Sequence, residues 1–222
     1  MIAARQIAFG RGGKRKPYDA EVEYLESTGT QYIDTGVFAS LNTSVDIKAQ
    51  FTELFNDNAL ISMDNGYGSK ESFVLEYYPK FEICLSIGGA SPYWKTSTVM
   101  TVVKNTWYYI SAGRASATVN GVRFMREYGS GSPVNFTTTH HLYMFAFGRK
   151  GAPIIFGKAR IAYSKIYDNG VLLRDFIPVR VGDVGYMYDR VSGQFFGNSG
   201  TGAFIVGPDA TSTNGGGITA DV

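Results

Sequence analysis

The chain has 222 residues, with one cysteine, two histidines and a net charge of +2. The single cysteine excludes an intrachain disulfide, and the lack of any apolar stretch of about 18 residues excludes a membrane-spanning helix. A chain of this length can bury about 70% of its unfolded surface, so it needs no metal to fold.

Residues 1–18 indicate a basic N-terminal arm. They hold five Arg or Lys residues and no acid, and because the whole chain carries +2, the remainder carries −3. The apolar side chains that precede these charges would gain nothing in water, so we expect the arm to dock on a partner; a solvated tail is the alternative. The charges follow the apolar part, which is the reverse of a secretory signal, and we expect synthesis in the host cytoplasm without one. The predicted anchoring residues are Ile2, Arg5, Ile7, Phe9, Arg11, Lys14, Arg15 and Lys16.

The stretch "EVEYLESTGTQYIDTG" (21–36) contains three glutamates, Glu21, Glu23 and Glu26. Two carboxyl groups about 5 Å apart would suit a retaining glycosidase. On a strand, however, Glu26 would point away from the other two, and "STG" after it indicates a turn. We therefore interpret the glutamates as solvated edge charges and predict no enzymatic activity, with a glycan hydrolase as the least favoured alternative.

Short runs rich in Val, Ile, Thr, Tyr and Phe follow, separated by Gly, Asn, Asp or Pro, as is typical of a sandwich or barrel. The Asn120-Gly121 and Asn169-Gly170 pairs each predict a tight hairpin turn. Trp107 is expected in the core, and Cys84 is expected to be a buried thiol on a strand rather than a nucleophile. The predicted strands lie within 44–51, 58–63, 72–78, 81–87, 98–103, 106–112, 116–124, 141–147 and 159–179.

Two stretches read as loops that could hold a sugar. "GGASPYWKTS" (88–97) places Tyr93 and Trp94 among turn residues, and an exposed aromatic ring is otherwise hard to explain there. "MDNGYGSKES" (63–72) adds Asp64, Asn65 and Tyr67. These five residues are the candidate glycan-binding site; the alternative is that Trp94 folds back onto the sandwich and Tyr67 caps a turn.

The sequence does not favour a metal or a cofactor. Asp64, Asn65, Asp168 and Asn169 offer oxygens to calcium, but the Asn-Gly turns account for them without an ion. The two histidines are adjacent, so on a strand they would face opposite sides and could not share a metal.

Several segments resemble the concanavalin A-like lectin/glucanase superfamily in its laminin-G-like form. They are "NTWYYISAGRASATVNGVRF" (105–124), "HLYMFAFG" (141–148) and "GKARIAYSKIYDNGVLLRDFIPV" (157–179). The outer segments "YLESTGTQYIDTG" and "DFIPVRVGDVGYMYDRVSGQFFGNSGTGAFIVGPD" resemble a subgroup found in bacteriophages, prophages and gut bacteria. The resemblance implies two antiparallel sheets with loops at one rim and a concave face able to hold a ligand, but it does not specify the ligand.

We therefore expect an all-β, two-sheet antiparallel jelly-roll sandwich over residues 19–208, with the arm at 1–18 and a flexible Gly/Ser/Thr-rich tail at 209–222. The expected function is a non-enzymatic structural or adhesive component of the phage virion: a head decoration, a head fibre or a tail-associated module. The arm would bind capsid or tail proteins, and the lectin-like domain would face cell-surface or mucus glycans. We expect a homo-oligomer, for example a trimer, because avidity strengthens weak sugar contacts. The alternative is a bacterial or prophage-encoded carbohydrate-binding module.

Overall fold

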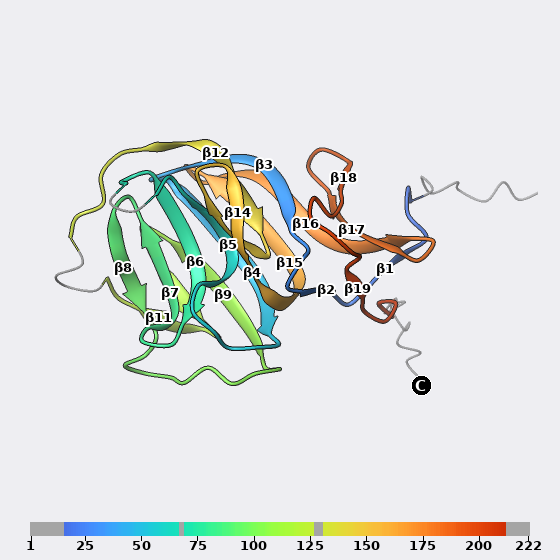
Figure 1. Cartoon of the computed structure of the whole chain (residues 1–222), viewed down its shortest axis with the longest axis horizontal. Coiled ribbons are helices and arrows are strands. Elements are labelled where there is room, and N and C mark those ends of the chain that lie inside the picture. Colours follow the sequence, from blue (N-terminus) through green and yellow to red (C-terminus); the bar gives the residue numbers. More distant parts are fainter. Residues whose placement is uncertain (1–15, 67–68, 127–130, 212–222) are drawn as a thin grey trace, which may run out of the picture.

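The computed structural model describes residues 16–66, 69–126 and 131–211, and every regular element in them is a β-strand (Figure 1). The strands form two large, mainly antiparallel sheets that pack against each other. The prediction of an all-β, two-sheet sandwich is therefore confirmed. Tyr67 and seven of the predicted anchoring residues lie outside the described residues: Ile2, Arg5, Ile7, Phe9, Arg11, Lys14 and Arg15.

The large sheet has eight strands in spatial sequence and three short strands added to its edges. Its order is β11 (Val122–Phe124), β10 (Ala117–Val119), β9 (Trp107–Gly113), β4 (Thr43–Phe51), β15 (Lys158–Asp168), β16 (Val171–Val181), β17 (Val184–Asp189) and β18 (Gln194–Phe196). The added strands are β1 (Ala20–Glu21) on β16, β2 (Leu25–Thr28) on β15, and β19 (Ile205–Val206) on β2.

The small sheet contains six strands in sequence and one flanking pair. Its order is β14 (Ala152–Phe156), β13 (Ala146–Arg149), β5 (Asn58–Asp64), β6 (Ser72–Tyr78), β7 (Glu82–Ile87) and β8 (Ala90–Lys95). The flanking pair is β12 (Thr137–Met144), which bonds to β5, and β3 (Ile33–Ser40), which bonds to β12.

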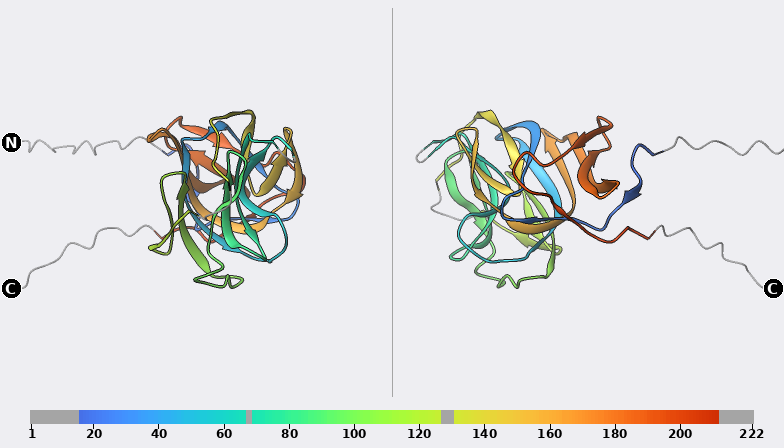
Figure 2. Two further views of the ribbon diagram at one scale, coloured as in Figure 1. Left: turned by 90° about the vertical axis from the view of Figure 1, so that its left-hand side faces the viewer. Right: turned by 45° about the vertical axis from the view of Figure 1, so that its right-hand side comes forward.

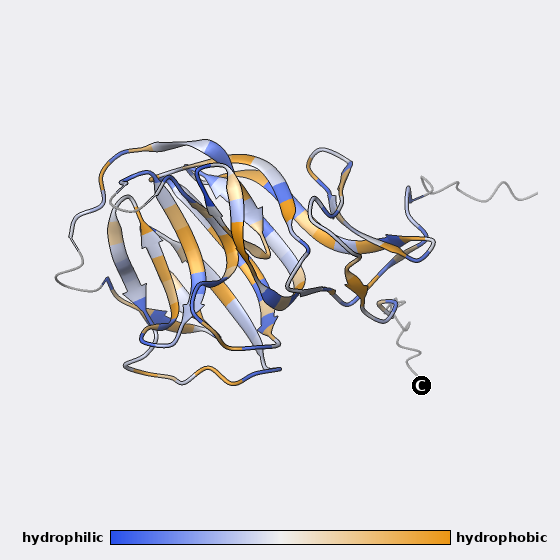
Figure 3. Cartoon of the chain, in the orientation of Figure 1, coloured by the Kyte–Doolittle hydropathy of each residue, from blue (hydrophilic) through white to orange (hydrophobic). Residues whose placement is uncertain are grey.

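The core lies between the sheets and follows from the alternation of the strands. In β4 the side chains of Val45, Ile47 and Ala49 are fully buried, whereas Asp46 and Lys48 lie on the other face. Apolar residues run along the strands of both sheets (Figure 3), and the central strands β5, β6 and β7 of the small sheet bury residues of both phases. Cys84 is buried on β7, as the sequence predicted. The largest fully buried side chains are Trp94, Phe51, Phe73, Phe145 and Phe176.

Trp107 is not in the core, so that prediction is wrong. Tyr108, Ile110 and Ala112 of β9 are buried, which leaves Trp107 and Tyr109 on the outer face of the large sheet. Because residues 107–109 are all aromatic, the sequence alone does not show which phase of the alternation faces inward.

The two Asn-Gly hairpins are present as predicted, but one predicted strand is not. Asn120 and Asn169 have φ values of 50° and 49°, and each is followed by a glycine with positive φ. Residues 98–103 form a loop between β8 and β9. Their amides bond to local groups instead of a neighbouring strand: Val102 N donates to Glu82 Oε2 (2.7 Å) and Val103 N to Tyr108 Oη (2.8 Å).

The far end of β16 carries an extension that projects from the sandwich (Figures 1 and 2). β16 pairs with β15 as far as Phe176, and beyond it pairs with β17 and β1. β2 then occupies the edge of β15 that β16 has left. Both described ends of the chain lie on this extension, where Arg180 Nε and Nη2 each donate to the Asp209 carboxylate at 2.7 Å.

Candidate functional site

The two candidate rings of 88–97 lie on a strand and not on an exposed loop, and Trp94 packs onto the sandwich, which is the alternative that the sequence left open. Gly88 and Gly89, both with positive φ, complete the turn, and β8 begins directly after them at Ala90. Trp94 pairs with Leu85 on the core side and is 1% exposed; Tyr93 is 7% exposed and its hydroxyl donates to the Arg114 carbonyl (3.2 Å). Neither ring presents an open face to a sugar.

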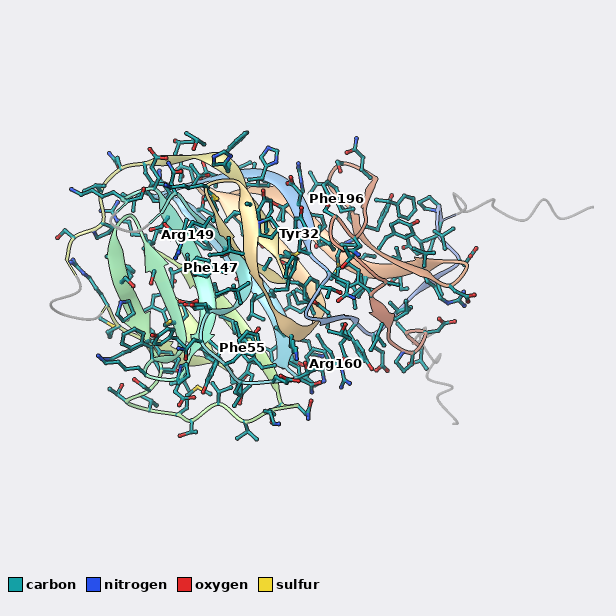
Figure 4. The ribbon with its side chains drawn as sticks, viewed as in Figure 1. Tyr32, Phe55, Phe147, Arg149, Arg160 and Phe196 are labelled. Carbon is teal, nitrogen blue, oxygen red and sulfur yellow. The ribbon has the colours of Figure 1, made fainter. Side chains whose placement is uncertain are left out.

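The candidates Asp64 and Asn65 hold their own loop together. Asp64 Oδ1 accepts from Gly66 N (3.0 Å), and its Oδ2 lies 3.5 Å from Arg149 Nε. Asn65 Nδ2 donates to Glu71 Oε2 (2.8 Å). The Arg149 guanidinium lies over the Phe147 ring at 5.3 Å, so this corner is filled by its own side chains (Figure 4).

The three glutamates near the N-terminus differ in their hydrogen bonds and in their exposure. Glu21 Oε1 accepts from Lys16 Nζ (2.5 Å) and from the Tyr18 hydroxyl (2.8 Å), and the bond from Lys16 lowers the pKa of Glu21. Glu26 Oε2 accepts from Arg160 Nε (2.5 Å) and the Glu26 side chain is little exposed, so Glu26 is not the solvated edge charge that the sequence predicted. Only Glu23 is exposed in the predicted way. The predicted turn also begins later, at Gly29, because Ser27 and Thr28 belong to β2.

An open hollow of about 470 Å³ lies on the outer face of the large sheet. We call it the sheet trough and define it by six of its lining residues, Asp46, Tyr109, Tyr163, Lys165, Asp175 and Arg190. Strand register places these side chains side by side. Ser111, Asp46, Lys165 and Asp175 are successive partners across β9, β4, β15 and β16, and directly paired residues share a face of the sheet.

A second cross-strand row on the outer face of the large sheet contains aromatic side chains. Lys48 pairs with Tyr109 on one side and with Tyr163 on the other. Its ammonium group lies 5.0 Å from the Tyr109 ring centroid and 5.1 Å from that of Trp107. Tyr109 is 51% exposed, which leaves a ring face open to the solvent.

The polar groups of the sheet trough are oriented before any ligand binds. Arg190 Nε and Nη2 donate to the two oxygens of Asp175, both at 3.0 Å, and this contact raises the pKa of Arg190. Partial burial, with the Asp46 charge nearby, raises the pKa of Tyr163. The Tyr163 hydroxyl is therefore protonated near neutral pH and available as a hydrogen-bond donor.

Two further hollows adjoin the sheet trough. A hollow of about 600 Å³ begins at Ser111, which it shares with the trough, and reaches Tyr93 and Arg114. A further hollow of about 130 Å³ shares Tyr93 and Arg114 with the second and extends to β11. The three hollows thus adjoin through common lining residues.

Sequence reasoning missed every residue that defines the trough. One pattern in the sequence could have identified part of the trough: in β4, the polar residues Asp46 and Lys48 alternate with buried residues, so their side chains lie on the outer face of the sheet. In β15, Tyr163 and Lys165 likewise lie on the outer face of the sheet. Register between strands distant in sequence then brings these residues together, and the sequence does not reveal that register.

The described residues contain no group of three or more His, Cys, Asp or Glu side chains placed to hold a metal ion. The same residues form no helix of the length and hydrophobicity needed to cross a bilayer. Comparisons of the chain with protein-family models, curated proteins and solved structures found no match.

Proposed function

We propose that this protein is a non-enzymatic carbohydrate-binding module that holds a glycan chain along the sheet trough. The observation that carries the proposal is the row formed by the exposed Tyr109 and the half-buried Tyr163, which lies beside the charged row of Asp46, Lys165 and Asp175. Sugars present apolar C–H faces and hydroxyl edges, which match ring faces and charged hydrogen-bonding groups respectively.

The shape of the site also supports a chain-like ligand. The trough lies open on a sheet face and adjoins two further hollows, so it can accept residues in the middle of a polymer as well as its end. Arg190 donates to both Asp175 oxygens, and this contact orients the carboxylate to accept further hydrogen bonds from sugar hydroxyls.

Truncation of the trough tyrosines is expected to lower glycan affinity. We expect Tyr109→Ala and Tyr163→Ala each to weaken binding by about tenfold, since a central aromatic contact contributes about 1 kcal/mol or more. Binding would be measured by calorimetry against the best ligand from a glycan array. Phe38→Ala is the matched control, because Phe38 is an equally exposed ring (49%) outside the trough. Loss of affinity in the control but not in the tyrosine variants would contradict the proposal.

We further propose that the module is a component of a bacteriophage particle, anchored by residues 1–18. The support is the resemblance of the outer segments to phage and prophage proteins, together with the basic, partly apolar arm. Attachment to capsid or tail proteins would array the troughs, and a homo-oligomer would do the same, so that weak sugar contacts act together.

Mass spectrometry of density-purified particles tests the location. Stoichiometric recovery that resists low-salt washing, and that is lost when residues 1–15 are deleted, is expected. Absence from clean particles, with glycan binding retained, would favour the bacterial or prophage-encoded binding module instead.

A further inference from the structure

The smallest of the three hollows is lined by arginine. It lies where the β8 edge of the small sheet meets the β11 edge of the large sheet, and we call it the arginine hollow. Arg114, Arg123 and Arg126 line it together with Tyr93 and Trp94. All three arginines are exposed. Three exposed arginines beside a space of about 130 Å³ make the local potential positive.

The contacts within the hollow leave donors available. None of the ion pairs among the described residues involves these three arginines. Arg126 is oriented by its stacking over Tyr93 (5.5 Å) and by donation from Nη2 to the Gly131 carbonyl. Trp94 is almost fully buried, and its indole Nε1 has no hydrogen-bond partner among the described residues. A buried donor without a partner is costly, and an acceptor atom entering the hollow would reduce that cost.

The arginine hollow is continuous with the sheet trough. Arg123 pairs with Thr118, which pairs with Ser111, so Arg123 begins the same cross-strand row that continues to Asp46 and Lys165. Arg114 lines both the arginine hollow and the hollow of about 600 Å³ that lies between it and the sheet trough. A polymer in the trough therefore reaches the guanidinium groups without leaving the surface.

We infer that the arginine hollow binds the anionic substituent, a carboxylate or a sulfate ester, of an acidic polysaccharide whose chain lies in the sheet trough. This inference rests on the proposed glycan-binding function and names its ligand class. Guanidinium groups form paired, charge-assisted hydrogen bonds to carboxylate and sulfate oxygens, while the Tyr93 ring bounds one side of the space. Neutral glycans can use the trough but gain nothing from the hollow.

The test compares matched charged and neutral polymers on the full chain at one fixed ionic strength. The pairs are polygalacturonate with its methyl ester, and dextran sulfate with dextran. We expect the wild-type protein to bind at least one charged polymer about a hundredfold more tightly than its neutral partner, with about tenfold from each of two arginines. Arg123→Ala/Arg126→Ala, at two arginines that line the arginine hollow but neither of the other two hollows, should abolish that preference and leave neutral binding within about twofold. Lys80→Ala/Lys104→Ala removes the same charge from exposed positions outside the hollows and should change neither.

The outcomes separate this inference from the proposed function. Equal affinity for charged and neutral polymers would contradict anion binding in the arginine hollow, but it would be consistent with glycan binding in the sheet trough. Charged-polymer binding that the arginine pair abolishes, but that Tyr109→Ala/Tyr163→Ala leaves intact, would support an anion site and contradict glycan binding in the trough. Equal affinity for single-stranded DNA would show unspecific polyanion binding, and failure to bind either charged polymer would overturn the inference.

Discussion

Replacement of Asp189 by alanine is expected to lower the free energy of unfolding by about 3–5 kcal/mol, as for a buried carboxylate whose partners are left behind. Asp189 ends β17 and is fully buried. Its Oδ1 accepts from the amides of Asp175 (2.8 Å) and Val191 (3.1 Å), and its Oδ2 accepts from the amide and hydroxyl of Ser192 (3.2 and 2.7 Å). With alanine at this position, four hydrogen-bond donors would lose their acceptor, and each donor left unpaired in a buried position lowers the free energy of unfolding by about 1 kcal/mol or more.

Two milder variants at the same turn calibrate this effect. Ser192→Ala removes a single donor and should cost about 1 kcal/mol, and Asp189→Asn, which keeps one acceptor oxygen, should fall between the two. Urea unfolding of the three variants gives the order directly. Equal losses for Asp189→Ala and Ser192→Ala would show that the carboxylate does not organise the turn.

Asp189 also connects stability to the candidate site. Asp175 receives a bond from Arg190 N through its carbonyl oxygen (2.9 Å) while its own amide donates to Asp189. The Asp175–Arg190 ion pair at the end of the sheet trough is therefore held by the same turn. Asp189 is a positioning residue, and its loss should weaken glycan binding even where the protein remains folded, for example at low temperature.

The strands were the predictable part of this fold because their chemistry is local. Alternation in 44–51 and the Asn120-Gly121 turn each specify a conformation from a few adjacent residues. Residues 98–103 carry the same apolar composition, yet their amides bond to the Thr96 carbonyl and to the side chains of Glu82 and Tyr108 instead of to a neighbouring strand. No local pattern distinguishes that loop from a strand.

The site was less predictable because it is made by register between distant strands. The glycine, serine and proline around Trp94 indicate a surface loop, but Trp94 pairs with the buried Leu85 and faces the core. The arginine hollow requires β8 and β11 to meet at the sheet edges, and the trough requires β4, β9, β15 and β16 to align. Composition identifies none of these pairings.

Glu76 is a buried carboxyl group and carries the largest expected pH effect. It lies on β6, between Ala59 of β5 and Cys84 of β7, and is 6% exposed. Its Oε2 is buried and has no hydrogen-bond partner in the part of the chain that the structure describes. Burial, together with the charges of Asp57 and Asp64, raises the pKa of Glu76 from 4.5 to about 8. Burial likewise raises the pKa of the neighbouring Cys84 thiol, which keeps it protonated and unreactive.

The folded protein therefore holds a proton on Glu76 that the unfolded chain releases above pH 4.5. Since the folded state binds more protons between these two pKa values, the contribution of Glu76 lowers stability as the pH rises from about 4.5 to 8, and it is constant outside that window. Each pKa unit corresponds to about 1.4 kcal/mol, so the full cost is about 3–5 kcal/mol above pH 8.

Glu76→Gln should remove this dependence, because the amide mimics the protonated carboxyl at every pH. We expect the variant to match the wild type at pH 4.5 and to exceed it by about 3 kcal/mol at pH 7, with a larger gain at pH 9. Urea unfolding at the three pH values measures the difference, in which the titrations common to both proteins cancel. Glu23→Gln, at an exposed glutamate, is the control and should show no gain that grows with pH. A constant difference between Glu76→Gln and the wild type would mean that Glu76 is ionised in the folded protein throughout, with a cation or water satisfying Oε2.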